Sequence, residues 1–122
     1  MSDINYSITG QVKKGALSQS FAASGITADI ATAGVLSLTL NLGTSVTQVS
    51  TATLGSLGLC FARSLATTTT HTVSFGRYTG GTLYETARLK AGEAALLRLA
   101  AGEYAAKAAV EGTRLVLTVY ED

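Results

Sequence analysis

Histidine and cysteine are the residues that most often act as general bases, nucleophiles and metal ligands, and this chain has one of each, His71 and Cys60. A zinc site normally needs three or four ligands from Cys, His and carboxylate side chains. These two residues have no patterned acids beside them, so the sequence predicts no metal site. Cys60 lies in the apolar run 57–61, which predicts a small buried residue. His71 lies in a threonine-rich stretch, which predicts an exposed loop.

Serine, carboxylate and phosphate-loop chemistry are equally poorly supported. The segment 73–76, with Ser74 at its second position, resembles the end of a nucleophile elbow, but Thr72 occupies the place of the first glycine. Glu93 and Glu103 each follow a glycine, which predicts solvated charges in turns. Lysine never follows glycine, so the P-loop pattern is absent. We therefore predict no catalytic residues, no cofactor and no enzymatic activity.

One cluster predicts binding. Tyr78 and Tyr84 flank Gly80-Gly81, and Arg77 adjoins the first tyrosine. An aromatic platform beside a hairpin can stack a sugar ring or anchor a partner protein. The alternative interpretation is an ordinary cross-strand aromatic pair. A glycan screen on the wild type and Tyr84→Ala discriminates a lectin-like module from a protein that binds no sugar.

Composition and charge exclude other classes of function. The 122 residues are 47% hydrophobic and only 14% charged, with a net charge of +1. A nucleic-acid-binding protein needs a basic stripe to displace counterions from phosphates, and no basic run exceeds two lysines. No stretch reaches the roughly 18 apolar residues of a membrane span. The N-terminus shows no basic segment followed by an apolar one, so we expect no secretory signal and a reducing cytoplasm as the place of synthesis.

Period-two alternation of apolar and polar residues is the dominant pattern, and it predicts strands. In segment 57–61 we expect Leu57, Leu59 and Phe61 on one face and the small residue Cys60 on the other, with both faces covered. Gly80-Gly81 predicts a tight hairpin because both glycines tolerate positive φ. The alternating segments are 4–8, 26–30, 36–42, 46–51, 57–61, 73–75 and 115–119.

Residues 88–93 are similar to residues 98–103, an internal repeat at a spacing of ten residues. Each copy ends with a turn that contains a glycine, which predicts successive strands of a meander. The region 93–111 is rich in helix formers. We predict strands there, because hairpin patterns lie on both sides, with a short helix at 93–101 as the alternative.

About eight short strands without a helix predict an all-β fold, an antiparallel β-sandwich of the jelly-roll type. An immunoglobulin-like sandwich is the second choice, although its Cys and Trp hallmarks are missing. We expect one domain, 1–122, in which 1–14 forms either an N-terminal arm or an ordinary first edge strand.

The order of motifs in residues 55–122 resembles small tailed-bacteriophage virion proteins. In those proteins a G-x-x-x-x-R-N-L strand precedes a V-x-x-G strand, an L-K-x-G-E turn and an R-L strand. Here the first motif runs from Gly58 to Leu65 with Ser64 in place of Asn, and the others begin at Val73, Leu89 and Arg98.

The resemblance implies a jelly-roll or sandwich building block of a virion, most closely a capsid decoration (cement) protein, made in the host cytoplasm. Such proteins act by assembly and carry no catalytic site. The implied partners are copies of the chain itself, for which a trimer would suit a lattice with local threefold positions, and the major capsid protein or another virion protein. Neither a nucleic acid nor a membrane is implied.

Overall fold

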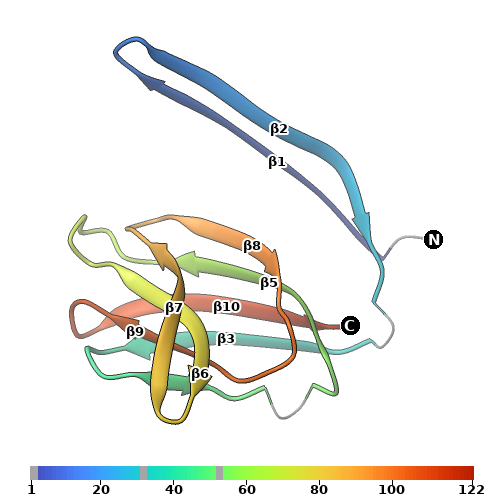
Figure 1. Cartoon of the computed structure of the whole chain (residues 1–122), viewed down its shortest axis with the longest axis vertical. Coiled ribbons are helices and arrows are strands. Elements are labelled where there is room, and N and C mark those ends of the chain that lie inside the picture. The colour runs from blue at the N-terminus through green and yellow to red at the C-terminus, as the bar shows by residue number, and fades with distance from the viewer. Residues whose placement is uncertain (1–2, 31–32, 52–53) are drawn as a thin grey trace. The chain divides into compact units, whose positions relative to one another are not determined.

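The computed structural model describes residues 3–30, 33–51 and 54–122, and it divides the chain into two compact units, Met1–Ala31 and Thr32–Asp122. Both units consist of antiparallel strands joined by turns, and no helix occurs in these three ranges (Figure 1). The all-β prediction is therefore confirmed, and residues 94–98 form a strand where a short helix was the alternative.

The first unit is a long β-hairpin made of β1 (Ile4–Lys14) and β2 (Leu17–Ala28). Gly15, with φ of 57°, supplies the left-handed backbone that its two-residue turn requires. Gly25, with φ of 65°, lies where the register shifts in a β-bulge. At the open end, the carboxylate of Asp3 accepts a 3.0 Å hydrogen bond from the backbone N–H of Ile30. Residues 4–14 thus pair with 17–28 and form a separate two-stranded sheet.

The second unit, called the body below, contains two four-stranded antiparallel sheets. Sheet one has the order β3-β10-β5-β8, and sheet two has the order β4-β9-β6-β7. The strands are β3 (Val35–Leu42), β4 (Thr47–Val49), β5 (Leu57–Ser64), β6 (Val73–Thr79), β7 (Thr82–Leu89), β8 (Ala94–Arg98), β9 (Tyr104–Ala108) and β10 (Thr113–Glu121).

The pairing of the body strands is nested. The first strand pairs with the eighth, the second with the seventh, the third with the sixth and the fourth with the fifth. This nesting is that of one long hairpin folded over into two sheets, and the arrangement is compatible with the predicted β-sandwich. It also brings chain segments far apart in sequence into register, such as β3 beside β10.

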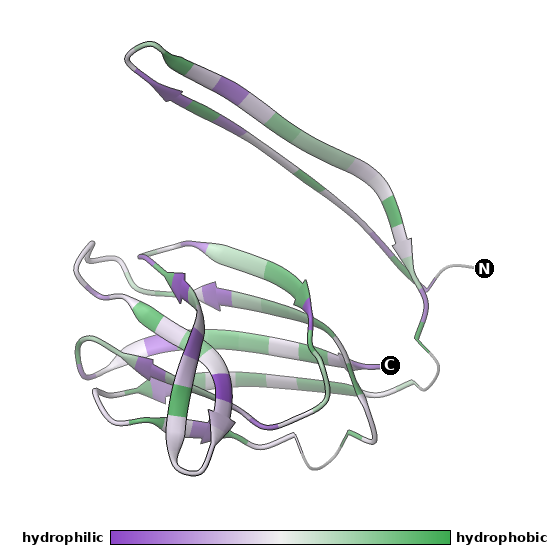
Figure 2. Cartoon of the chain, viewed as in Figure 1, coloured by the Kyte–Doolittle hydropathy of each residue, from purple (hydrophilic) through white to green (hydrophobic). Residues whose placement is uncertain are grey.

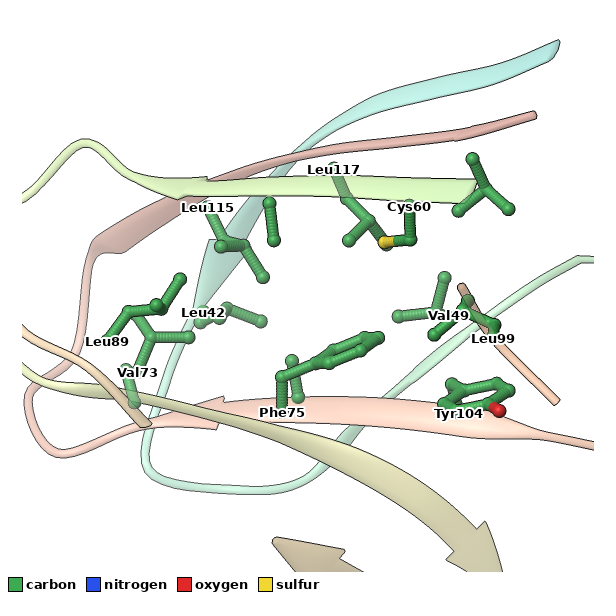
Figure 3. Packing of buried hydrophobic residues seen from close by; sticks show 14 residues of the cluster. Leu42, Val49, Cys60, Val73, Phe75, Leu89, Leu99, Tyr104, Leu115 and Leu117 are labelled. Atoms are coloured by element: carbon green, nitrogen blue, oxygen red, sulfur yellow. The ribbon is translucent and has the colours of Figure 1, made fainter. Parts of the chain in front are cut away.

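The core lies between the two sheets, as Figure 3 shows. Leu115, Leu117 and Val119 alternate along β10 and are at most 1% exposed, as the period-two pattern predicts. From the opposite sheet, Phe75 stacks on Tyr104 with ring centroids 5.7 Å apart and the rings 11° from parallel. Apolar burial of this kind contributes about 25 cal/mol per Å² and is the main stabilising term of the body.

Two sequence predictions about the body are wrong. On β5 the two faces alternate as predicted, with Cys60 facing the core, but the expectation that both faces are covered is wrong at Phe61. Phe61 lies opposite Thr118 on the outer face and is 38% exposed, whereas Leu59 on the same face is 6% exposed. Small core-facing side chains on β5 leave room for Phe75, which lies across the core (Figure 3). The predicted meander is also incorrect, because β8 joins sheet one whereas β7 and β9 belong to sheet two. The two turns of the internal repeat, at Gly92 and Gly102, therefore carry the chain from one sheet to the other.

Candidate functional site

The structure separates the residues of the predicted aromatic platform. Across the Gly80-Gly81 turn, Arg77 pairs with Tyr84 and Tyr78 pairs with Leu83. Neighbouring positions on a strand point to opposite faces, so the two tyrosines lie on different sides of the ribbon. The arginine is also engaged, because its guanidinium carbon lies 5.8 Å from the ring centroid of Tyr104. One exposed aromatic, Tyr84, remains for the lectin-like alternative.

The residues considered for chemistry are likewise dispersed. Ser74 is a buried residue within the extended strand β6, which lacks the sharp turn of a nucleophile elbow. His71 is half-buried in the loop before that strand, where its backbone N–H donates to the carbonyl of Thr68 at 2.9 Å. Within the described residues, no group of three or more His, Cys, Asp or Glu side chains could hold a metal ion.

Cys60 is fully buried, and the loss of solvation raises the pKa of its thiol from the ordinary 9.0 to about 12. The thiolate is the reactive form, so the buried thiol is chemically inert near neutral pH. This position agrees with the prediction of a small core residue, and it makes the contribution of Cys60 to stability depend on pH in alkaline solution.

We expect Cys60 in the folded protein to resist a thiol reagent at pH 8 and to react once the chain is unfolded. Because the folded pKa lies above the unfolded one, protonated Cys60 stabilises the fold fully below pH 9 and loses this effect as pH rises toward 12. The destabilisation caused by Cys60→Ala should therefore shrink by about 1.4 kcal/mol per pH unit above 9. Urea unfolding at pH 8 and pH 10 measures this, and an unchanged difference would contradict it.

The outer surface of sheet two carries a shallow polar hollow of ≈ 380 Å³. It contains an ion pair in which Arg88 Nε lies 2.7 Å from a Glu85 carboxylate oxygen. This hydrogen bond is the main reason why the pKa of the Glu85 carboxyl group is lowered. The pair is solvated and is worth little for stability. Lys107 and Ser74 also line the hollow, which holds one carboxylate and two cations. The hydroxyl of Ser74 is a hydrogen-bond partner of the Glu85 carboxylate.

The outer surface of sheet one is mainly apolar or hydroxyl-bearing; we call it the open face. Its central rows run across the sheet in register, with Thr118 between Ser37 and Phe61, and Val116 between Thr39 and Arg63. Its accessible apolar members are Val35, which is 59% exposed, Phe61, which is 38% exposed, and the half-buried Leu96, Val116 and Tyr120. Leu59 lies on the same side of the sheet but is buried. Arg63 and Arg114 lie at one end of this face, and within the described residues neither has a carboxylate within 4.0 Å.

The hairpin presents a second apolar surface. Cross-strand partners point to the same side of a sheet, and on one side the paired residues are mostly apolar. Figure 2 shows this alternation of hydrophobic and hydrophilic residues along β1 and β2. We call this side the hairpin face; its apolar members are Ile4, Tyr6, Ile8, Val12, Leu17, Phe21, Ala23, Ile26 and Ala28.

The opposite side of the hairpin is polar, as the pairs Gln11 with Ser20 and Lys13 with Ser18 illustrate. Sequence reasoning recognised residues 1–14 as a possible arm and 26–30 as an alternating segment, but missed that one strand runs from Leu17 to Ala28 and pairs with the arm. After the turn glycine, Leu17, Phe21 and Ala23 lie at alternating positions, with Gln19 as the exception, and this pattern could have revealed it.

No family model, curated protein or solved structure matches this chain. The described residues contain no helix long and apolar enough to cross a membrane.

Proposed function

We propose that this protein is a non-enzymatic structural building block that acts by associating with copies of itself and packing on or into a phage particle, most specifically as a head decoration protein. The observation that carries the self-association is the open face, an outer sheet surface on which Phe61 is 38% exposed and Val35 is 59% exposed. The resemblance of residues 55–122 to tailed-phage virion proteins is the reason for proposing that the assembly is a phage particle.

The chemistry of the open face suits association between proteins. Contiguous exposed apolar patches on folded domains mark interaction surfaces. The hydroxyl groups of Ser37, Thr39 and Thr118 around its centre are neutral, so covering them removes no charge from water. Arg63 and Arg114 at the rim are residues of a type enriched in protein interfaces.

The net charge of +1 adds to this argument. Strong net charge keeps proteins apart by mutual repulsion, and this chain has almost none. Copies can therefore approach at ordinary ionic strength without an electrostatic barrier.

Two measurements test the two parts of the proposal. The solution mass, from size-exclusion chromatography with light scattering, should exceed that of one chain. Immunogold labelling of particles produced by the phage or prophage that encodes the chain should decorate the head. Label on the tail alone would contradict a head decoration role, and label on neither would contradict a virion role.

A further inference from the structure

The hairpin has two free edges and no core of its own. Within the described residues, β1 and β2 pair only with each other (Figure 1). On the hairpin face, Phe21 is 55% exposed and Leu17 is 50% exposed. A two-stranded ribbon is marginally stable in water, and three or more strands with an apolar face are needed for independent stability. The hairpin therefore gains stability when further strands join it.

The two free edges differ in regularity. At the bulge, one residue of β1, Ser7, lies opposite two residues of β2, Ser24 and Gly25, so the extra residue belongs to β2. A bulge twists the edge of a sheet away and protects it from pairing with another strand. β1 is a regular strand of 11 residues without proline. The edge that is open to another strand is therefore that of β1.

The turn determines which backbone groups face the free edge of β1. Lys14 and Leu17 flank the two-residue turn, and a flanking pair of this kind exchanges two backbone hydrogen bonds. Because such pairs alternate along an antiparallel strand, the odd-numbered residues of β1 point their N–H and C=O groups to the free edge. These exposed residues, on the polar side of the hairpin, are Asn5, Ser7, Thr9, Gln11 and Lys13.

The charges along this edge have opposite signs at its two ends. Asp3 precedes β1, where its carboxylate accepts the hydrogen bond from Ile30, and Lys13 lies ten residues later beside the turn. Both residues are exposed, and the alternation of the strand places both on the polar side. In the described part of the chain, neither has an oppositely charged side chain within 4.0 Å. An antiparallel strand with an acid at its start and a base at its end would complement both.

A second copy of β1 is such a strand. In the register that places Asp3 opposite Lys13 of the second copy, the symmetry of the pair places Lys13 opposite the second copy's Asp3. Directly opposite side chains have Cβ atoms about 5 Å apart, which is within reach of an ion pair. The same register aligns odd-numbered with odd-numbered residues, so the free N–H and C=O groups of the two edges meet. Four hydrogen-bonded pairs, and hence about eight hydrogen bonds, join the two strands.

The apolar residues match in this register as well. On the hairpin face, Ile4 lies beside Val12 of the second copy, and Ile8 lies beside its own counterpart at the symmetry axis. A shift of the second strand by two residues adds one hydrogen-bonded pair, but it places Ile4 opposite Lys14 and removes the partner of Asp3. Charge and apolar pairing therefore favour the register centred on Ile8.

We propose that β1 pairs antiparallel with β1 of a second copy of this chain, so that two hairpins form one four-stranded sheet of order β2-β1-β1-β2 with Asp3 opposite Lys13 at both ends. The contact is closed, because it uses the free edge of β1 in both copies and leaves only the bulged edges. This inference rests on the proposed self-association and adds the edge of the hairpin to the surfaces that carry it.

Charge reversal in the full-length chain tests the pairing. Lys13→Glu places carboxylates opposite each other at both ends of the sheet, and Asp3→Lys does the same with cations. Each variant alone should raise the concentration at which the oligomer is half dissociated by about tenfold or more, measured by light scattering across a dilution series. An equimolar mixture of the two variants should recover the wild-type value, because a mixed pair has opposite charges at both ends.

The matched control is Lys14→Glu, which makes the same change one residue away, on the other side of the ribbon. It should change the half-dissociation concentration by less than about threefold. A variant that fails to fold cannot recover on mixing, so recovery in the mixture depends on the pairing itself. A mixture that stays as dissociated as its components would overturn the proposal, and so would equal losses for Lys14→Glu and Lys13→Glu.

Cross-linking tests the register. Ser7 and Thr9 of the two copies form a hydrogen-bonded pair on the polar side, with Cα atoms about 5.5 Å apart, which a disulfide can bridge. Mixed and mildly oxidised, Ser7→Cys and Thr9→Cys chains should form a linked dimer. Either variant alone should not, because its two thiols lie two residues apart along the strands, with Cα atoms more than about 7 Å apart. The buried Cys60 thiol does not compete.

The outcomes separate this inference from the proposed function. A wild type of single-chain mass at every concentration overturns both. An oligomeric wild type that is insensitive to Lys13→Glu, or whose Ser7→Cys and Thr9→Cys variants do not link when mixed, overturns the pairing of β1 and leaves self-association through the open face standing. Thr9→Cys chains that link to one another instead would overturn the register and with it the proposal.

Discussion

Replacing Leu115 by alanine should lower the free energy of unfolding by about 3–4 kcal/mol. Leu115 is fully buried near the start of β10, which pairs with β3 on one side and β5 on the other. Truncation removes apolar contacts in the core between the two sheets and leaves a cavity. The cavity cannot readily collapse, because β10 is hydrogen-bonded to a strand on each side. Urea denaturation of both proteins at one protein concentration measures the difference.

The next residue along the strand provides the matched control. Val116 points to the open face and is only partly buried, so Val116→Ala should cost less than about 1 kcal/mol in the same experiment. Equal losses for the two variants would show that β10 does not present Leu115 to a core, and the two-sheet packing would be wrong.

Gly76→Ala should be the most disruptive glycine substitution in the body, costing about 3 kcal/mol. The β-bulge between Phe75 and Gly76 brings β7 so close that an added Cβ would overlap the carbonyl oxygen of Tyr84 and lie 2.7 Å from the backbone nitrogen of Thr86. Both atoms belong to the backbone, so relief requires β7 to move away from β6. Thermal unfolding of the variant and the wild type provides the measurement.

Substitutions at Gly80 provide the control, because they distinguish a steric clash from strain in the backbone conformation. Its φ is +58° and nothing lies within 4 Å of an added Cβ, so Gly80→Ala should cost only about 1–2 kcal/mol. Asparagine tolerates positive φ, so Gly80→Asn should recover much of that loss. At Gly76 asparagine should be worse than alanine, because the obstacle there is backbone of β7. If asparagine rescued position 76, the close approach would be incorrect.

The strands whose alternation faces a single core could be predicted from the sequence. Residues 36–42 and 115–119 carry leucines and valines at every second position, and this pattern is set by local geometry alone. Gly80 and Gly81 were equally informative, because both adopt the positive φ that a two-residue hairpin needs.

The orientation of β5 and the sheet assignment of β8 could not be read in this way. When both faces of a strand are apolar, as around Cys60 and Phe61, only pairing with a distant strand decides which face is inside. That pairing joins residues about 60 positions apart, such as Cys60 and Val119. Similarly, a glycine turn such as that at Gly92 indicates that the chain reverses but not whether it stays in the same sheet.

The candidate site shows a different limitation. With a two-residue turn at Gly80-Gly81, register alone places Tyr78 opposite Leu83 and Tyr84 opposite Arg77, so the splitting of the tyrosines was predictable from the sequence. The open face was not predictable, because its rows combine residues from β3, β10, β5 and β8 that only the nested pairing brings together.

The central claim is that the chain acts by associating with copies of itself. Its most direct test is the mass of the purified wild type by size-exclusion chromatography with light scattering across a hundredfold dilution. We expect a closed oligomer whose mass is an integer multiple of one chain and stays constant over the upper part of the series. The mass of a single chain at every concentration would contradict the claim.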